Sequence, residues 1–194
     1  MIKFLKGALK NHNPTIENWD DPTKRIFNGQ IIEGRPTKGF GTSSFNYAGK
    51  LYEPEPWTSQ IKSVKKAAER IVLKELNKKV EFTFCLCGLY ETGQIAIPHH
   101  SDTVPTLKDI VFSISFGEPR LFEWKKYNYY IKKRTTTSKT HILHGDKFTK
   151  TKLYLLEHGD CLIFDGDSQM TSTHAVPPIV GAGKRMNLTF RSGL

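Results

Sequence analysis

Residues 97–102, Ile-Pro-His-His-Ser-Asp, are the stretch around which the rest of the chain can be organised. On an extended strand, side chains two positions apart point to the same face. His100 and Asp102 therefore project together, while His99 and Ser101 point the other way. An imidazole and a carboxylate on one face can hold two adjacent positions on a metal ion, so the stretch predicts part of a metal site carried by a strand.

A third ligand from a distant strand would complete the two-histidine, one-carboxylate face that is typical of non-haem Fe(II) oxygenases. A His-x-Asp spacing alone is weak support for such a site, because it arises by chance in many chains. A histidine and an aspartate in a surface turn would also explain it, since Val104-Pro105 follows directly. The choice between the two interpretations depends on the rest of the sequence.

Residues 185–191, near the C-terminus, alternate polar and apolar side chains without a break, which predicts a strand. One face carries Arg185, Asn187, Thr189 and Arg191, and the other carries Met186, Leu188 and Phe190. Arginines on an enclosed face need an anionic partner, and a dicarboxylic acid would suit because guanidinium binds carboxylate bidentately. An edge strand with a solvated basic face is the alternative.

Three motifs in order resemble the AlkB family of Fe(II)- and 2-oxoglutarate-dependent nucleic-acid dealkylases. They are His100-Ser101-Asp102, His174-Ala175-Val176-Pro177 and Arg185-x-Asn187-x-Thr189-x-Arg191. The segments at residues 115–122 and 155–160 also resemble family segments, and the similarity covers roughly residues 39–194. Several motifs in the right order are much stronger than any one of them.

The resemblance implies a role for each matching residue. His100, Asp102 and His174 would hold Fe(II). Arg185 would bind the distal carboxylate of 2-oxoglutarate, and Tyr90, Asn187 and Arg191 would make its other contacts. The remaining candidates for the third iron ligand are His158 and His144, and His99 competes with His100. Asp160 and Thr189 are interpreted as structural residues.

The activity that the resemblance implies is oxidative demethylation of N-alkylated bases in DNA or RNA. The reaction would consume molecular oxygen and 2-oxoglutarate and release formaldehyde, succinate and carbon dioxide. Two other classes stay open, an oxygenase acting on protein or a small molecule, and a nucleic-acid-binding module with a degenerate site. The chain departs from the family pattern at Gly88, where many members carry asparagine, and at Thr103-Val104, where many carry acidic residues.

Residues 45–57 are rich in aromatic and turn residues and resemble the family's nucleotide-recognition lid, which we place at residues 39–57. Tyr47 matches the aromatic residue that stacks on the target base, and such stacking contributes about 1–3 kcal/mol per base. Packing of the lid against the core is the alternative for Tyr47. For Trp57 we favour that packing role.

The chain carries 29 Lys and Arg against 19 Asp and Glu, a formal charge of +10, which favours a polyanionic partner. A lysine-rich surface that only promotes solubility is the alternative. Basic and aromatic residues alternate in residues 125–150, which we interpret as a hairpin or mobile insertion on the rim. Such a segment suits a phosphate backbone and unstacked bases.

Regular structure is predicted most clearly for residues 58–77, where apolar residues recur at helical spacing behind Thr58 or Ser59 as a cap. Asp20-Asp21-Pro22 is interpreted as the cap of a second, short helix with Pro22 in its first turn. Strands are predicted at residues 30–33, 80–86, 110–116, 121–124, 152–156, 161–164 and 186–191, and residues 35–41 are expected to form a loop. The fold class is therefore α+β, mainly β: a double-stranded β-helix, or jelly roll, with the helix packed on one sheet.

A length of 194 residues predicts a single domain over residues 1–194, with residues 1–38 as an N-terminal extension. We expect a monomer, no membrane partner, and an intracellular location. The three cysteines do not form a disulfide framework, which favours a reducing compartment. Cys85 and Cys87 share one face of a strand, where buried structural thiols are a better interpretation than zinc ligands.

Overall fold

The computed structural model describes most of the chain. The described residues are 2–22, 24–27, 30–47, 50–102, 107–128, 130–134, 140–144, 147–164 and 168–193. No helix in these ranges has the length and apolar character needed to cross a membrane.

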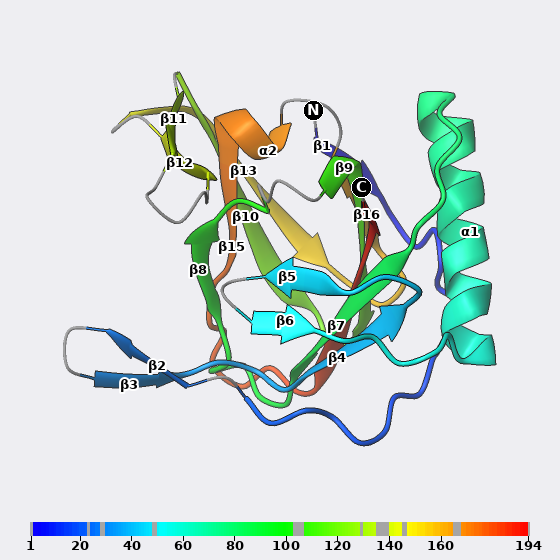
Figure 1. The fold of residues 1–194 in the computed structure, drawn as a ribbon. Helices are drawn as coiled ribbons and strands as arrows, with labels where there is room; N and C mark the ends of the chain where they lie inside the picture. The colour runs from blue at the N-terminus through cyan, green and yellow to red at the C-terminus, as the bar shows by residue number, and fades with distance from the viewer. Residues whose placement is uncertain are drawn as a thin grey trace.

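Two antiparallel sheets face each other and form the body of the molecule (Figure 1). The larger sheet has the order β1 (Ile2–Leu5), β14 (Cys161–Phe164), β9 (Leu107–Gly117), β16 (Arg185–Gly193), β7 (Phe84–Tyr90) and β4 (Thr37–Gly41). The smaller sheet has the order β13 (Phe148–Leu156), β10 (Arg120–Tyr127), β15 (Ser172–Val176) and β8 (Ile97–His100). This arrangement is the expected jelly roll.

Three hairpins and a short helix complete the described elements around these sheets. The hairpins are β2 (Lys24–Phe27) with β3 (Gln30–Glu33), β5 (Phe45–Tyr47) with β6 (Lys50–Tyr52), and β11 (Tyr130–Arg134) with β12 (Thr140–His144). The short helix is α2 (Ser168–Thr171), just before β15. The pairing of β11 with β12 lies inside the basic segment at 125–150, where a hairpin was one expectation.

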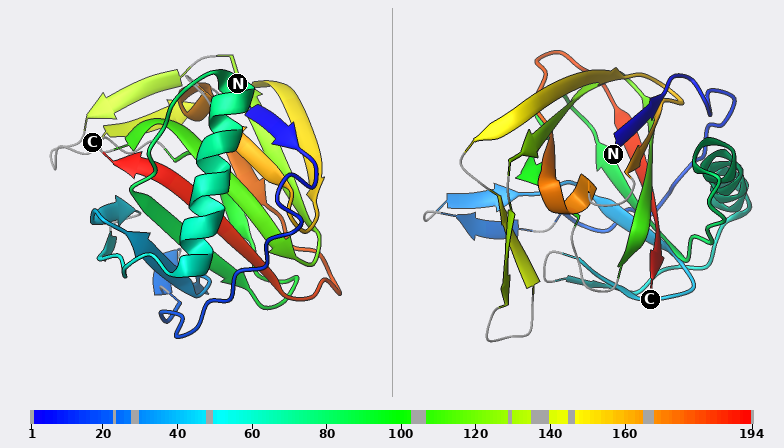
Figure 2. Two further views of the ribbon diagram at one scale, coloured as in Figure 1. Left: turned by 90° about the vertical axis from the view of Figure 1, so that its right-hand side faces the viewer. Right: turned by 90° about the horizontal axis from the view of Figure 1, so that it is seen from above.

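The long helix α1 (Ser59–Leu76) lies across the outer face of the larger sheet (Figure 2). Its N-cap is Thr58, whose side-chain hydroxyl accepts a hydrogen bond from the Ile61 N–H at 3.2 Å. It ends at Asn77, which takes the left-handed conformation common at helix C-termini. The predicted helix at residues 58–77 is therefore confirmed, cap residues included. Its apolar stripe, with Ile61, Val64 and Ala68 at the centre, faces the sheet.

The larger sheet separates two apolar clusters because side chains alternate along each strand. Between the sheet and α1 lie outward-facing residues such as Cys85, Cys87, Leu188 and Phe190. Between the two sheets lie Tyr90, Leu162 and Phe164 with Phe122, Trp124 and Val176 of the smaller sheet. The polar face of β16 also points into this inter-sheet space, which places the predicted functional residues there.

Three sequence-based expectations were wrong in detail. Residues 35–41 are not all loop, because Thr37–Gly41 forms β4 at the edge of the larger sheet, paired with β7. The strand predicted at residues 80–86 is β7, which begins only at Phe84 and runs on to Tyr90. Its later start is explained by the Phe82 N–H, which donates to the Glu69 side chain of α1 at 2.9 Å instead of to a neighbouring strand. The short helix expected after Asp20 is absent from the described residues, where Asp20 instead bridges to Thr37 of β4.

Glycines explain why β4 was missed. A Cβ at Gly39 would approach the Phe84 ring to 3.2 Å, and a Cβ at Gly41 would collide with the Thr83 carbonyl. The close approach of this edge strand to β7 thus requires residues of low strand propensity. At the other edge, β1 pairs with β14, so residues 2–5 belong to the sheet itself.

Candidate functional site

A cavity between the two sheets brings together most of the residues that the sequence singled out. Its lining includes Tyr90, His100, Asp102, His174, Arg185, Asn187 and Arg191, together with Arg35, Ser113 and the rings of Phe122 and Phe164. These residues come from segments far apart in the sequence, most of them strands, and only the closing of the jelly roll makes them neighbours.

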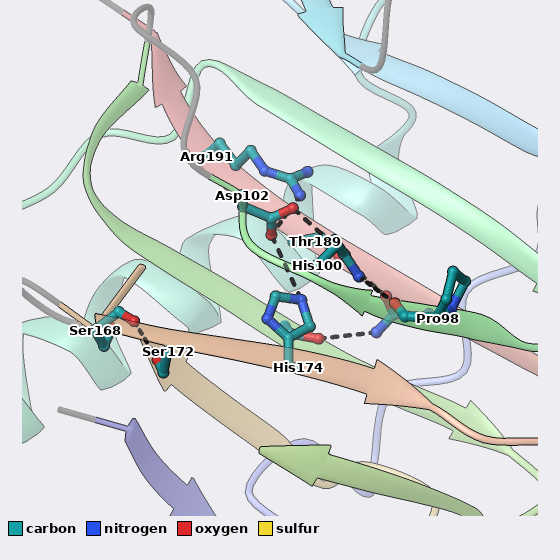
Figure 3. A network of polar contacts seen from close by, with 10 residues as sticks. Pro98, His100, Asp102, Ser168, Ser172, His174, Thr189 and Arg191 are labelled. Atoms are coloured by element: carbon teal, nitrogen blue, oxygen red, sulfur yellow. Dashed lines mark hydrogen bonds and ion pairs between the residues drawn. The ribbon is translucent and has the colours of Figure 1, made fainter. Parts of the chain in front are cut away.

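The two histidines lie on adjacent strands of the smaller sheet. His174 of β15 pairs directly with His100 of β8, so their side chains stand next to each other, with ring centroids 4.3 Å apart. Asp102 follows β8 two residues later and points to the same side (Figure 3). Its carboxylate lies 3.8 Å from His100 Nε2 and 4.0 Å from His174 Nε2. One ligand atom from each residue lies within 4.8 Å of the other two.

The hydrogen bond made by His100 Nδ1 leaves the inward nitrogen, Nε2, available as a ligand. His100 Nδ1 lies 2.9 Å from the carbonyl oxygen of Pro98, which can only accept a hydrogen bond. Nδ1 must therefore carry the proton and donate it, so Nε2 directs its lone pair toward Asp102 and His174. A metal-bound histidine commonly has its other ring nitrogen held by a carbonyl or carboxylate in this way.

His174 is enclosed by aromatic rings. Its imidazole stacks on Phe122 at 5.3 Å and lies 5.1 Å from the ring of Phe164. Burial, reinforced by the charge that His100 would carry, lowers the pKa of His174 to about 3, although Asp102 opposes the shift. His174 is therefore neutral near pH 7, which is the form that can bind a metal ion.

Asp102 is a buried carboxylate that stays ionised. Burial alone would raise its pKa, but the charge of Arg191, the charges of His174 and His100, and a hydrogen bond from Arg191 together lower the pKa below its ordinary value. That hydrogen bond runs from Arg191 Nη2 to Asp102 Oδ2 at 2.9 Å. Two imidazoles and one carboxylate gathered at one cavity are the ligand set expected for a non-haem Fe(II) site.

The inner face of β16 supplies the positive charge of the cavity. Arg185 is 2% exposed, and its Nε and Nη2 both donate to Ser115 Oγ, at 3.2 and 2.7 Å. Its guanidinium carbon lies 4.7 Å from the centroid of the Tyr90 ring. Burial is the main reason that the pKa of Arg185 is lowered. Among the described residues, no group accepts a hydrogen bond from its buried Nη1. A cation held in this way is suited to an anionic ligand.

Asn187 is largely committed to the protein. Its amide nitrogen donates to Ser113 Oγ at 2.9 Å and to the Ile114 carbonyl at 2.8 Å, and its oxygen accepts from the Thr189 hydroxyl at 3.0 Å. The second lone pair of the oxygen is what Asn187 can still offer to a ligand. Thr189 donates its hydroxyl hydrogen to the Asn187 side chain and so holds that side chain in place, in line with the structural role expected for Thr189.

The alternative histidines are engaged elsewhere. His158 accepts at Nδ1 from the Gly117 N–H at 3.2 Å and donates from Nε2 to the His12 carbonyl at 3.1 Å. His99 points away from His100, with Nδ1 3.1 Å from Thr173 Oγ1 and Nε2 3.2 Å from Glu123 Oε2. The side chain of His144 lies outside the described residues.

Asp160 serves the backbone, as expected of a structural residue. Its carboxylate accepts from the N–H groups of Gly7 and Glu157, at 2.6 and 2.8 Å. In this way it ties the segment after β1 to the turn that precedes β14.

The segment expected to form the lid is only partly described. Residues 45–47 and 50–52 pair as a hairpin, but the side chain of Tyr47 lies outside the described residues. Trp57 packs into the outer cluster, where its ring stacks on Phe190 at 6.3 Å. The packing interpretation of Trp57 therefore holds.

Sequence reasoning missed Arg35, Ser113 and Ser115. The serines alternate along β9 and could have been found from their inward register beside the predicted arginine strand. Arg35 stands between β3 and β4, in a stretch expected to be loop. The sequence pointed to Arg35 only indirectly, through Gly88, because many family members carry the larger asparagine at that position.

Comparison with known proteins adds a family and several relatives. The family model described as the 2OG-Fe(II) oxygenase superfamily matches residues 15–191. The chain is 29% identical to alpha-ketoglutarate-dependent dioxygenase alkB homolog 3 of Homo sapiens over 163 residues, which cover 81% of this chain and 51% of that protein. The proteins of the same name from Bos taurus and Mus musculus are 29% and 28% identical, with the same coverage. The chain thus spans about half the length of these relatives.

A solved structure, that of OsALKBH1, shares the fold. It has a TM-score of 0.59 and 19% sequence identity, over 98% of this chain and 97% of that chain. At that identity the likeness concerns the architecture, and it agrees with the jelly roll described above.

Proposed function

The chain belongs to the 2OG-Fe(II) oxygenase superfamily, in its AlkB branch, and from that premise we propose that it oxidatively demethylates N-alkylated bases in DNA or RNA. The products would be formaldehyde, succinate, carbon dioxide and the restored base. The observation that carries the proposal is the convergence of His100, Asp102 and His174 beside a buried arginine face in one cavity.

In this proposal, His100, Asp102 and His174 bind Fe(II) through two neutral imidazoles and an ionised carboxylate. Bound iron, with 2-oxoglutarate and molecular oxygen, supplies the oxidising chemistry. The protein orients the ligands: the Pro98 carbonyl fixes the tautomer of His100, and Arg191 fixes the Asp102 carboxylate. The rings of Phe122 and Phe164 keep water from the side of His174.

The cosubstrate is assigned to the inner face of β16. Arg185, anchored by Ser115, would bind the distal carboxylate of 2-oxoglutarate, and Tyr90, Asn187 and Arg191 would make the other contacts. The support is electrostatic, because a buried guanidinium with an unsatisfied N–H gains most from a carboxylate partner.

The nucleic-acid part of the proposal rests on the AlkB relatives and on the formal charge of +10. A base attacked inside this cavity would have to be flipped out of a duplex or already single-stranded. Tyr47, in the lid at residues 39–57, would stack on that base, and the basic rim at residues 125–150 would lie against flanking phosphates.

We also propose that residues 1–194 form one domain that acts as a monomer inside the cell. Its substrate class and its three free, buried cysteines favour a reducing compartment. Light scattering during gel filtration should give the mass of a single 22.1 kDa chain.

The activity can be tested by mass spectrometry. The protein is loaded with Fe(II) without oxygen, mixed with 2-oxoglutarate and methylated DNA or RNA oligonucleotides, and then exposed to oxygen. We expect each methyl group lost to appear as formaldehyde, with succinate formed alongside. His174→Ala should show neither. Succinate formation without demethylation of any oligonucleotide would instead indicate an oxygenase that acts on protein or a small molecule.

A first prediction concerns Tyr47. Tyr47→Ala should weaken demethylation by about one stacking contact, or about 1–3 kcal/mol. It should leave succinate formation in the absence of nucleic acid almost unchanged, because the iron site keeps all its groups. Equal demethylation by the variant and the parent chain would show that Tyr47 only packs the lid.

A further inference from the structure

Position 88 of β7 leaves a gap on the inner face of the larger sheet. Gly88 lies between Asn187 of β16 and Thr37 of β4 in register, and Tyr90 follows it on the same face. The gap is not empty, because the side chain of Arg35 enters it. A Cβ placed on Gly88 would collide with Arg35 Nε and would lie 3.0 Å from both Cδ and Cζ of the same side chain.

The backbone holds Arg35 at this place. The next residue, Pro36, accepts a hydrogen bond through its carbonyl from the Leu89 N–H at 2.9 Å, which ties the loop before β4 to the strand that carries Gly88. The Arg35 guanidinium carbon then lies 5.3 Å from the centroid of the Tyr90 ring. Arg185 lies 4.7 Å from the same centroid, so two cations share one aromatic ring.

These two cations have no anionic partner within the protein as far as it is described. No carboxylate of the described residues forms an ion pair with Arg35 or Arg185, whereas Arg191 pairs with Asp102. Arg35 Nε and Arg185 Nη1 are both buried, and within the described ranges neither has a hydrogen-bond partner. Two like charges with unsatisfied buried donors are costly unless a ligand supplies the opposite charge.

We propose that Arg35 and Arg185 together bind the distal carboxylate of the dicarboxylate cosubstrate. The Arg35 side chain can take this position because Gly88 has no side chain and leaves room for it. The inference rests on the proposed 2-oxoglutarate dependence and adds to it a residue from outside the β16 motif. Two guanidinium groups around one carboxylate favour a ligand that is charged at both ends. Gly88 is required because any side chain at position 88 would displace Arg35.

The test measures binding without turnover. The full chain is loaded with Mn(II), which accepts the same kind of ligands as Fe(II), and 2-oxoglutarate is titrated by calorimetry. Arg35→Ala should weaken binding about 10- to 100-fold, the range for loss of a charge-assisted hydrogen bond. Arg70→Ala removes one positive charge from the exposed side of α1 and is the matched control, with affinity unchanged.

A second ligand locates the contact. The acid 2-oxobutyrate has the same 2-oxo acid head but lacks the distal carboxylate. Arg35→Ala should therefore leave the affinity for 2-oxobutyrate unchanged. Equal weakening for both acids would overturn the assignment of Arg35 to the distal end.

Gly88→Ala tests the gap itself. The added methyl group should push Arg35 out and cause a loss of 2-oxoglutarate affinity similar to that of Arg35→Ala. The double variant should bind no more weakly than either single variant, because both changes remove the same contact. Fully additive losses would contradict the proposal.

The remaining outcomes separate this inference from the function on which it rests. If the parent chain binds 2-oxoglutarate and Arg35→Ala binds it equally well, Arg35 only packs on Tyr90, and the proposed function stands. If the Mn(II)-loaded parent chain does not bind 2-oxoglutarate at all, both proposals fail. Thermal unfolding of each variant shows whether it is folded at the temperature of the titration.

Discussion

Neighbouring residues of β16 face opposite sides of the larger sheet, and each side has residues that are almost fully buried. Leu188 and Phe190 are 0% exposed and pack toward α1, whereas Arg185 and Arg191 are 2% and 3% exposed and line the cavity. Apolar burial on the first face stabilises the fold. On the second face Arg191 is paired with Asp102, whereas no anionic partner of Arg185 is found among the described residues, and a buried charge without a partner indicates a ligand. Similar burial on one strand therefore has two different consequences: it stabilises the fold on the face toward α1, and it indicates a ligand on the face toward the cavity.

The largest expected effect on stability lies on the face toward α1. Phe190 has its ring 5.8 Å from that of Phe82 and 6.3 Å from that of Trp57. Phe190→Ala should lower the free energy of unfolding by about 3–5 kcal/mol. Urea denaturation measures the loss, and Phe190→Leu should show a smaller one. Succinate formation per folded molecule should stay near that of the parent chain. A Phe190→Ala protein that is as stable as the parent chain but forms no succinate would contradict the assignment of folding to the face toward α1 and of ligand binding to the cavity face.

On the cavity face, Arg185→Ala should affect binding rather than folding. Removing a charge-assisted partner should weaken the apparent affinity for 2-oxoglutarate by about 1.5–3 kcal/mol. The free energy of unfolding should be unchanged or higher, since a desolvated cation is removed. The dependence of succinate formation on 2-oxoglutarate concentration and urea denaturation provide the two measurements. A loss of stability as large as that of Phe190→Ala would mean that Arg185 is mainly a structural residue.

The smallest expected effect concerns the thiols on the face toward α1. Burial raises the pKa of Cys87 well above its ordinary value, with a further contribution from Cys85, whose Sγ lies 3.7 Å away. A buried, protonated thiol reacts slowly. Iodoacetamide should therefore label none of the three cysteines in the native protein and all three in denaturant, as counted by mass spectrometry. Native labelling of Cys85 or Cys87 would show that this face opens.

The sequence predicted those parts of the molecule that follow from local periodicity. The alternation in residues 185–191 predicted which side chains of β16 face the cavity, and the stripe behind Thr58 predicted α1. The His-x-Asp spacing correctly placed His100 and Asp102 on one side of β8. In each case the spacing of polar and apolar residues within one short segment is enough to predict which side of the strand or helix each side chain faces.

Other parts depend on contacts between distant segments. The nearness of His174 to His100 arises from the pairing of β15 with β8, which no local pattern encodes. His174 was favoured over His158 by the family resemblance and by the position of His158 in a turn before a strand. The strand β4 was missed because tertiary packing requires glycines where propensity favours loop. Arg35 was missed because its place depends on a gap in another strand.

The central claim is that His100, Asp102 and His174 form an iron site on the inner side of the jelly roll. The most direct test is the iron content of protein that is loaded with Fe(II) without oxygen and then desalted. The parent chain and His158→Ala should each retain one equivalent, and His174→Ala should retain almost none. Equal retention by His174→Ala and the parent chain, or equal loss in both histidine variants, would contradict the ligand assignment.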